Sequence, residues 1–205
     1  MGQEKRRRTD EIIGKGGQME KPMYKVAVIV DMQKDFTTGA LGNKACEAVI
    51  PKIVDVIVYG GYDEVFLTRD THDEHYLDTQ EGRKLPVVHT QRGEEGWQIV
   101  PAIMEAVHAN CEADRIHVID KPTFGSEELM LAIKDIAKDY KEYGELQVDF
   151  MGVCTGICVI SNVLPAKMAA PEATIRVIDS ACACVTPESH RTAIEAMRTC
   201  QVDIV

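Results

Sequence analysis

The sequence contains no apolar run that reaches the roughly 18 residues a membrane-spanning helix needs. It also lacks an excess of basic residues, since 23 Lys and Arg stand against 33 Asp and Glu, for a formal net charge of -10 at pH 7. This charge disfavours nucleic acids and anionic membranes as partners. The first residues lack the apolar segment of a signal peptide, so we expect a cytoplasmic protein.

The seven cysteines cannot all pair within the chain, because their number is odd. They are scattered through 205 residues, a pattern that favours reduced cytosolic thiols over a disulfide framework. Hydrophobic residues make up 45% of the sequence, which is enough for a sizeable core. The composition therefore indicates one globular domain that carries free thiols.

The first 22 residues differ in composition from the rest of the chain. They hold a basic run at 5–8 and a glycine-rich stretch at 14–17, with few apolar residues. We expect residues 1–22 to form a disordered extension and 23–205 a single domain. The possible start residues are Met1, Met19 and Met23.

Short apolar runs alternate with helical spacing from residue 23 onward. The apolar runs predict strands at residues 24–30, 64–68, 115–119, 146–151, 173–178 and 202–205. Helical spacing predicts helices at residues 47–59, 126–140, 158–170 and 187–199. This alternation is typical of βαβ units, and it predicts an α/β fold with a parallel sheet covered by helices on both faces.

Polar or reactive side chains follow several of the predicted strands. Asp31, Asp70 and Lys121 each come just after an apolar run, and the segment 154–158 follows another. The carboxyl ends of parallel strands meet at one edge of the sheet, which is where ligands bind in open α/β folds. The sequence therefore predicts a functional site at this edge.

Cys158 falls in the first turn of a predicted helix. Free backbone N–H groups and the helix dipole favour a thiolate there, and they suit a developing oxyanion. Cys154 lies four residues earlier. The alternatives are two small buried hydrophobic residues or a metal site, although no second Cys/His pair follows at suitable spacing.

Asp31 and Lys121 are candidates for acid–base chemistry beside this thiol. A carboxylate directly after a buried strand is costly unless it is paired or functional, and it can take a proton from a thiol. A nearby lysine stabilises both a carboxylate and a thiolate. The alternatives are a loop cap for Asp31 and an ordinary solvated lysine for Lys121.

The polar stretch 70–89 is rich in possible metal ligands. Asp70 and His72 follow a strand, and His75, Glu81 and His89 come after them. Carboxylates and imidazoles together suit Zn, Mn or Fe. The alternative is a polar loop without a metal. The histidines expected to be structural or exposed are His108, His117 and His190.

Four motifs occur in a fixed order along the chain. They read VDMQKDF at residues 30–36, TRDTH at 68–72, KPTFGS at 121–126 and GVCTGICV at 152–159. With these motifs the chain from Tyr24 onward resembles the isochorismatase-like cysteine hydrolases, and within them the nicotinamidases. The resemblance implies a three-layer α/β fold, with a mainly parallel sheet of about six strands and helices on both faces.

The resemblance also implies roles for particular residues. It makes Cys158 the nucleophile and Asp31 the base, with Lys121 beside them. The backbone N–H groups of Cys154 and Cys158 would hold the oxyanion, and the peptide bond between Val153 and Cys154 would be cis.

The same resemblance implies a substrate and a divalent metal ion, either Zn, Mn or Fe. Phe36 would pack on the substrate ring. The implied metal ligands are Asp70, His72, Glu81 and His89, with His75 as an alternative to Glu81. Two departures stand out, because Gly156 replaces a common aspartate and a Val-Val pair at 87–88 precedes His89 where two prolines are frequent.

The implied reaction is hydrolysis of a small-molecule amide, with nicotinamide as the expected substrate. Another amidohydrolase of the family, acting on an N-carbamoyl or ureido substrate, is the first alternative. A non-catalytic metal-binding or thiol-redox module is the second. A homo-oligomer is also possible.

Overall fold

The computed structural model describes residues 22–140 and 144–205 of the chain. The predicted disordered extension at 1–22 lies outside the described residues, apart from Pro22. None of the helices in the described part of the chain is long and apolar enough to cross a membrane.

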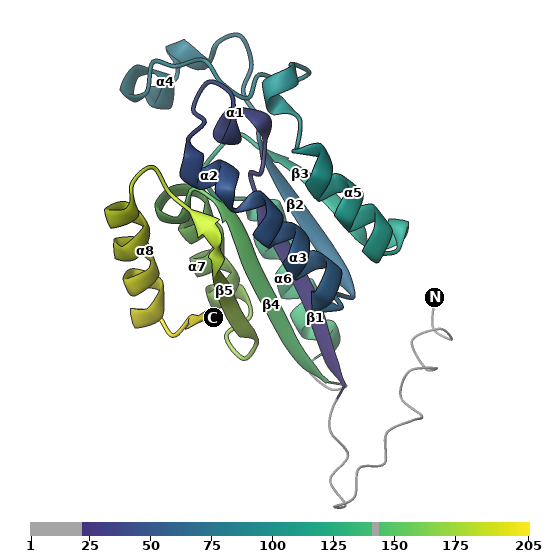
Figure 1. The fold of residues 1–205 in the computed structure, drawn as a ribbon. Helices are drawn as coiled ribbons and strands as arrows, with labels where there is room; N and C mark the ends of the chain where they lie inside the picture. The colour runs from purple at the N-terminus through teal and green to yellow at the C-terminus, as the bar shows by residue number, and fades with distance from the viewer. Residues whose placement is uncertain (1–21, 141–143) are drawn as a thin grey trace, which may run out of the picture.

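A parallel sheet of six strands forms the centre of the described structure (Figure 1). Its strand order is β3-β2-β1-β4-β5-β6, and every neighbouring pair is parallel. The strands are β1 Met23–Val30, β2 Glu64–Asp70, β3 Ile116–Lys121, β4 Glu145–Val153, β5 Thr174–Ala183 and β6 Asp203–Ile204. This sheet confirms the predicted fold class.

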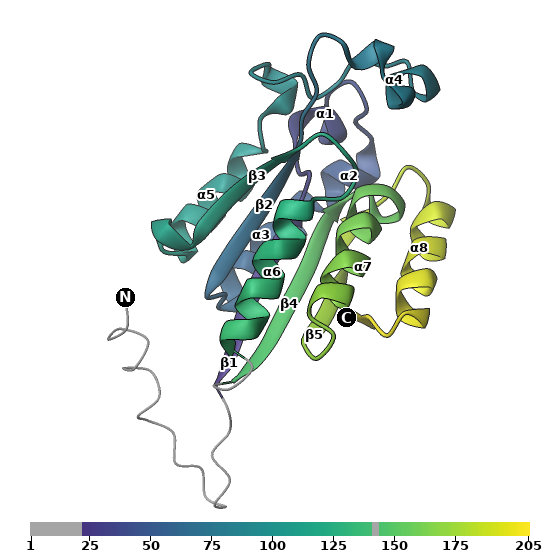
Figure 2. The same ribbon diagram turned by 180° about the vertical axis from the view of Figure 1, so that it is seen from behind.

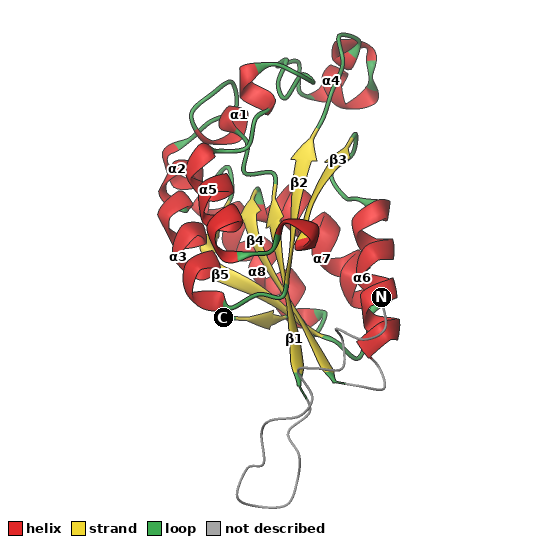
Figure 3. Cartoon of the chain, turned by 90° about the vertical axis from the view of Figure 1, so that its right-hand side faces the viewer, coloured by secondary structure: helices red, strands yellow, loops and turns green. Residues whose placement is uncertain are grey.

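Helices cover both faces of the sheet (Figures 1, 2 and 3). One face packs against α2 Lys44–Ala48, α3 Ile50–Gly60 and α5 Pro101–Asn110, and the other against α6 Glu127–Tyr140, α7 Ile160–Ala169 and α8 Pro187–Thr199. Two short helices lie beyond the carboxyl ends of the strands, α1 Lys34–Thr37 and α4 Gln80–Lys84. Single turns are η1 Tyr76–Asp78, η2 Glu95–Trp97, η3 Ala113–Arg115 and the π-helical turn η4 Thr155–Val159.

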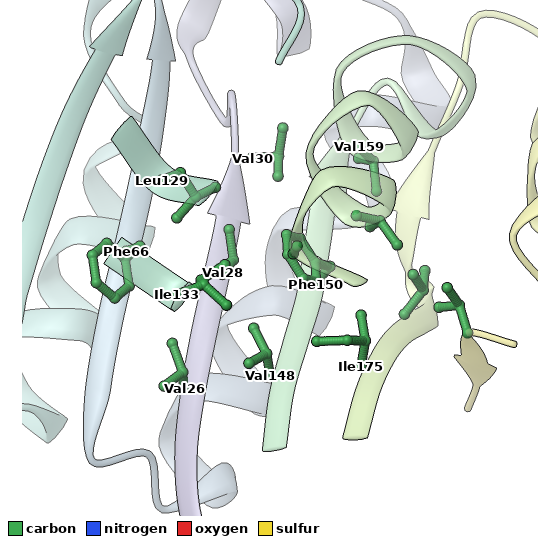
Figure 4. Close-up of a cluster of buried hydrophobic side chains, with 14 of the residues drawn as sticks. Val26, Val28, Val30, Phe66, Leu129, Ile133, Val148, Phe150, Val159 and Ile175 are labelled. Carbon is green, nitrogen blue, oxygen red and sulfur yellow. The ribbon is translucent and has the colours of Figure 1, made fainter. Parts of the chain in front are cut away.

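Two hydrophobic clusters hold the three layers together. Val28, Phe150 and Leu129 belong to the cluster on the α6–α8 face, where β-branched side chains of the central strands interdigitate with the helices (Figure 4). Ile29 and Leu67 point to the opposite face. Central strands that are buried on both faces need continuous apolar runs, which is the pattern in the sequence.

Several elements differ from their predicted limits. Strands β2 and β3 run on to Asp70 and Lys121, which pair across the sheet. The predicted helix 47–59 is two helices, since Asn43 caps α2 and Pro51 lies in the first turn of α3. Helix α5 was not predicted, and α4 lies in the stretch expected to be a loop.

Candidate active site

Four neighbouring strands deliver the predicted site residues to one edge of the sheet. Asp31 follows β1, Asp70 and Lys121 are the last residues of β2 and β3, and Cys154 follows β4. These strands are adjacent in the order β3-β2-β1-β4. The structure therefore brings together side chains that lie far apart in the sequence.

Asp31 is fully buried and held by two strands. Its backbone has a positive φ of 50°, a left-handed conformation that aspartate tolerates better than most residues. The hydroxyl of Thr68 donates to Asp31 Oδ1 over 2.7 Å, and Lys121 Nζ lies 2.7 Å from Oδ2. Both carboxylate oxygens thus face groups inside the site, and the side chain is not a loop cap.

Lys121 is 2% exposed, so the alternative of a solvated lysine is wrong. Its ammonium lies 2.7 Å from Asp31 and 3.7 Å from Asp70, and it donates to the carbonyl of Thr123 over 3.1 Å. Burial alone would lower the pKa of Lys121. The negative charges of Asp31 and Asp70, and that of Cys158 whenever its thiol is ionised, outweigh burial and raise the pKa, so the lysine stays protonated.

Cys158 lies in turn η4 beside this ion pair. Burial raises the pKa of the Cys158 thiol, and the charge of Asp31 and a hydrogen bond to it add to the rise, while Lys121 opposes it. Burial also raises the pKa of Asp31, against the effect of Lys121. The thiol therefore holds its proton in contact with a carboxylate that has gained proton affinity, an arrangement that allows transfer between them.

Cys154 has different neighbours. Its thiol shares its one proton with the sulfurs of Cys184 and Cys46, and hydrogen bonding to these neighbours raises the pKa of Cys154. The hydrogen bond from Cys154 in turn lowers the pKa of Cys184 to about 5. Of the two cysteines in the motif, Cys158 is the one that faces Asp31 and Lys121.

The turn that carries both cysteines is tied down by backbone and side-chain hydrogen bonds. The peptide bond between Val153 and Cys154 is cis, as the resemblance implied. The Cys154 carbonyl accepts from the N–H of Ile157 over 3.0 Å. The amide of Asn162 donates to the Cys158 carbonyl over 2.7 Å. The role of the turn's N–H groups as oxyanion donors stays a prediction.

Asp70, His72 and His89 form a compact group of possible metal ligands. Their donor atoms all lie within 4.8 Å of one another. Asp70 Oδ2 is 3.0 Å from His72 Nε2 and 3.5 Å from His89 Nε2. The second ring nitrogen of His89 lies 2.8 Å from the carbonyl of Val87, a contact that directs Nε2 toward the group.

The buried Nε2 of His72 supports the fit of a cation. It lies 3.0 Å from Asp70 Oδ2 and 3.8 Å from Glu81 Oε1, so it faces two carboxylates that could share a cation with it. A carboxylate and two imidazoles are ligands that Zn, Mn and Fe accept. The residues present therefore fit the divalent metal that the resemblance implied.

Glu81 and His75 differ in their relation to this group. Glu81 Oε1 lies 3.8 Å from His72 Nε2, and the side chain is 24% exposed, so it stands just outside the compact group. His75 is 73% exposed and faces Glu74 and Asp78. The arrangement favours Glu81 over His75 as a further ligand.

Aromatic rings line the metal-ligand group. Phe36 packs edge-on against His89, with 5.6 Å between ring centroids. Tyr76 lies 4.4 Å from the His72 ring and 4.9 Å from the His89 ring. Phe36 therefore stands where it can contact a ring bound next to the metal ligands. Tyr76 was not singled out in the sequence.

Other positioning groups were also missed. Gln33 exchanges two hydrogen bonds of 2.8 Å with the backbone of Asp70 and donates to the Trp97 carbonyl over 2.9 Å. Thr90 donates to Asp70 Oδ2 over 2.9 Å, and its N–H donates to Asp35 Oδ2 over 2.7 Å. Gln33 and Asp35 stand inside the first motif, so their place in VDMQKDF was the available signal.

The structure also gives partners to two histidines that were expected to be structural or exposed. His117 lies 2.7 Å from Glu64 and stacks on Phe66. His190 contacts Thr155 in turn η4 and Asp179 in β5. His117 lies in β3 at the edge of the sheet, whereas His190 reaches the candidate site through the turn.

Comparison with known proteins places this geometry in a family. The family model described as Isochorismatase domain matches residues 25–205. No curated protein sequence matches the chain.

Solved structures with the same fold include several amidases. The pyrazinamidase/nicotinamidase of Streptococcus mutans is 26% identical, with a TM-score of 0.73 over 88% of this chain and 99% of that one. The pyrazinamidase of Pyrococcus horikoshii, solved in complex with zinc, is 25% identical, with a TM-score of 0.67 over 88% and 98%. The nicotinamidase of Bacillus subtilis is 21% identical, with a TM-score of 0.72 over 89% and 99%, and shows likeness of fold.

Proposed function

Because the chain belongs to the isochorismatase family of hydrolases, we propose that it is a cysteine-dependent amidohydrolase that converts nicotinamide and water to nicotinate and ammonia. One observation carries this proposal. Lys121 Nζ lies 2.7 Å from Asp31 and 3.7 Å from Asp70, so the thiol–carboxylate–lysine trio adjoins the candidate metal ligands. A small ring with an amide substituent can reach both groups at once.

The first half of the reaction forms a thioester. Asp31 takes the proton from Cys158, and the sulfur attacks the amide carbon. Backbone N–H groups of the turn, from Cys154 and Cys158, hold the oxyanion. Asp31 returns the proton to the leaving nitrogen, the C–N bond breaks and ammonia departs. The raised pKa of Asp31 suits both steps, because the group must accept and then release a proton.

The second half hydrolyses the thioester. Asp31 removes a proton from water, which attacks the acyl carbon, and the same N–H groups hold the second oxyanion. The bond to Cys158 breaks, the sulfur regains its proton, and nicotinate leaves. Lys121 remains protonated throughout and stabilises the negative charge on either partner.

Asp70, His72 and His89 would hold the divalent metal, with Glu81 near them. When bound there, a metal would supply Lewis acidity toward the pyridine nitrogen of the substrate. Phe36 and Tyr76 contact the imidazoles of this group, and they are placed to exclude water and to limit the tilt of the substrate.

Ammonia release from a small panel of amides tests this function. We expect turnover of nicotinamide that falls with a chelator and returns with Zn, Mn or Fe. Benzamide has the same amide and ring shape but no ring nitrogen, so it should be a much poorer substrate.

Other outcomes of the amide panel would favour a different function. Equal rates on nicotinamide and benzamide, unaffected by chelator, would contradict the nicotinamide proposal and leave a general cysteine amidohydrolase. Ammonia from N-carbamoyl or ureido compounds alone would favour that branch of the family. Release from no amide at all would favour a metal-binding or thiol-redox protein.

A further inference from the structure

Three polar side chains form a hydrogen-bonded chain behind the nucleophile turn. The hydroxyl of Thr155, the first residue of η4, lies 2.8 Å from His190 Nδ1 on α8. His190 Nε2 lies 2.9 Å from Asp179 Oδ1 on β5. The three residues come from three separate elements, and none of them has a role in the reaction as described above.

The donor and the acceptor in each of these two hydrogen bonds can be assigned from chemistry. An aspartate carboxylate only accepts, so the proton on His190 Nε2 is donated to Asp179. In the neutral ring Nδ1 then carries the lone pair, and the hydroxyl of Thr155 donates to it. Asp179 thereby selects the tautomer that fixes the orientation of the hydroxyl.

Burial of these three side chains increases from Asp179 through His190 to Thr155. The side chain of Asp179 is 50% exposed and that of His190 is 21% exposed, whereas Thr155 is fully buried. The carboxylate thus orients the imidazole from the surface, and the imidazole holds a hydroxyl inside the protein. A buried hydroxyl needs such a partner, because water cannot replace it.

Thr155 gives the turn a side-chain hydrogen bond to α8, through His190. The next residue, Gly156, has no side chain and can make no such contact. Thr155 is also flanked by Cys154 and lies three residues before Cys158. A shift of Thr155 therefore moves the backbone that carries both cysteines.

We propose that His190 and Asp179 are positioning residues that hold Thr155, and through it the N–H groups that stabilise the oxyanion. This inference rests on the proposed function, since it assigns a task within that reaction. The two residues touch neither the substrate nor the reacting atoms. Their effect is on the stability of the tetrahedral species and not on the binding of the amide.

Thr155→Val is the primary variant, because valine keeps the shape of threonine and replaces the hydroxyl with a methyl group. We expect kcat for nicotinamide to fall about 10- to 100-fold while KM changes less than about 2-fold. His190→Ala should do the same, and the Thr155→Val/His190→Ala double variant should be no worse than either single variant. Thr155→Ser keeps the hydroxyl and should restore most of the rate.

Two reactions of the Cys158 thiol separate positioning from general damage. Alkylation by iodoacetamide, read at Cys158 by peptide mass mapping, develops no oxyanion and should proceed at the wild-type rate in all variants. Pyridine-3-carbaldehyde adds the thiol across its carbonyl, with the sulfur on carbon and the proton on oxygen. Its inhibition constant should rise by about the same factor as kcat falls, because the adduct presents an oxygen to the same N–H groups.

Clear results would overturn the inference. A kcat within about 2-fold of wild type in Thr155→Val or His190→Ala would do so. So would an alkylation rate of Cys158 that falls by the same factor as kcat, because that would show general damage to the thiol. Failure of the proposed function is distinguishable, because the wild type would then release no ammonia from nicotinamide. Direct binding of the aldehyde to Cys158 does not require turnover, and an unchanged aldehyde affinity in the variants would contradict the positioning role.

Discussion

Cys158, Asp31 and Lys121 depend on one another because each is buried beside the charge of another. Burial raises the pKa of both the thiol and the carboxylate, and Lys121 opposes both shifts. The lysine in turn keeps its proton because of the negative charges around it. The motifs predicted these three residues, since each motif begins at or near the end of a predicted strand.

The residues that hold the trio in place could not be predicted in the same way. Thr68 lies 37 positions from Asp31 along the chain, yet it donates to that carboxylate. Asn162 lies 36 positions from Ser126, whose N–H it accepts. Thr68 opens the motif TRDTH, but neither Thr68 nor Asn162 reveals its partner in the sequence, because these partners are defined only once the strands are side by side.

Cys158→Ala should abolish turnover, because the sulfur that attacks the substrate is lost. The melting temperature should change little, since the alanine leaves a gap of one atom. Cys154→Ala is the matched control and should keep substantial activity, because its thiol contacts Cys46 and Cys184 and not Asp31. Ammonia release measures both. An inactive Cys154→Ala together with an active Cys158→Ala would show that the nucleophile is misassigned.

Asp31→Asn should lower kcat by several orders of magnitude, because an amide cannot take the thiol proton. Lys121→Ala should be similarly severe, and it should also lower the free energy of unfolding by about 3–5 kcal/mol, since it leaves the buried Asp31 carboxylate without its cation. Steady-state rates and urea unfolding measure these effects. Near-normal rates in both variants at neutral pH would rule out this trio.

His72→Ala should reproduce the effect of a chelator, because it removes one of three clustered ligands. We expect loss of bound metal in elemental analysis, reduced nicotinamide turnover and no further loss on adding chelator. His75→Ala is the control, since that side chain is 73% exposed and faces Glu74 and Asp78. Equal metal content in the two variants would count against the ligand assignment.

At the scale of elements, the strands were easier to predict than the helices. Buried parallel strands such as β1 and β4 are apolar throughout, a signal that short helices lack. Helix α5 has only a weak amphipathic pattern and follows a long irregular stretch, so it was missed. The break between α2 and α3 depends on the Asn43 cap, which a window of helical spacing does not reveal.

Asn162 connects three elements of the site and is 2% exposed. It donates to the carbonyls of Cys158 and Phe124 and accepts from the N–H of Ser126. Asn162→Ala should lower the free energy of unfolding by about 2 kcal/mol, because the buried Ser126 N–H loses its acceptor. It should also reduce kcat, since turn η4 loses its tie to the loop after β3.

Asn110→Ala is the control for Asn162→Ala. Asn110 makes a hydrogen bond of 2.8 Å to the Ala106 carbonyl at the exposed end of α5. Its replacement should change the free energy of unfolding by less than about 0.5 kcal/mol. Urea unfolding of the two variants gives the comparison, and equal effects would contradict a linking role for Asn162.

At the scale of the whole molecule, the position of the site follows from the topology. A parallel sheet with adjacent strands β3-β2-β1-β4 brings four strand ends to one edge, and each end bears a motif. The sequence predicted this edge because the polar residues all follow apolar runs. It could not predict the strand order, which depends on long-range packing of both sheet faces.

A protein that starts at Met19 should fold and turn over substrate like the full chain, because the removed residues contain few apolar side chains. This start keeps Pro22, whose carbonyl accepts from the N–H of Glu145 over 3.1 Å. Melting temperature and kcat of the two proteins provide the check. A large loss in either would show that the removed segment packs on the domain.

The central claim is that hydrolysis passes through an acyl group on Cys158. Rapid acid quenching of the enzyme during nicotinamide turnover, followed by peptide mass mapping, tests it most directly. We predict a nicotinoyl group on the peptide that contains Cys158, bound to the sulfur of that residue, and no such group in Cys158→Ala. Acylation of a different residue, with ammonia release undiminished in Cys158→Ala, would contradict the account.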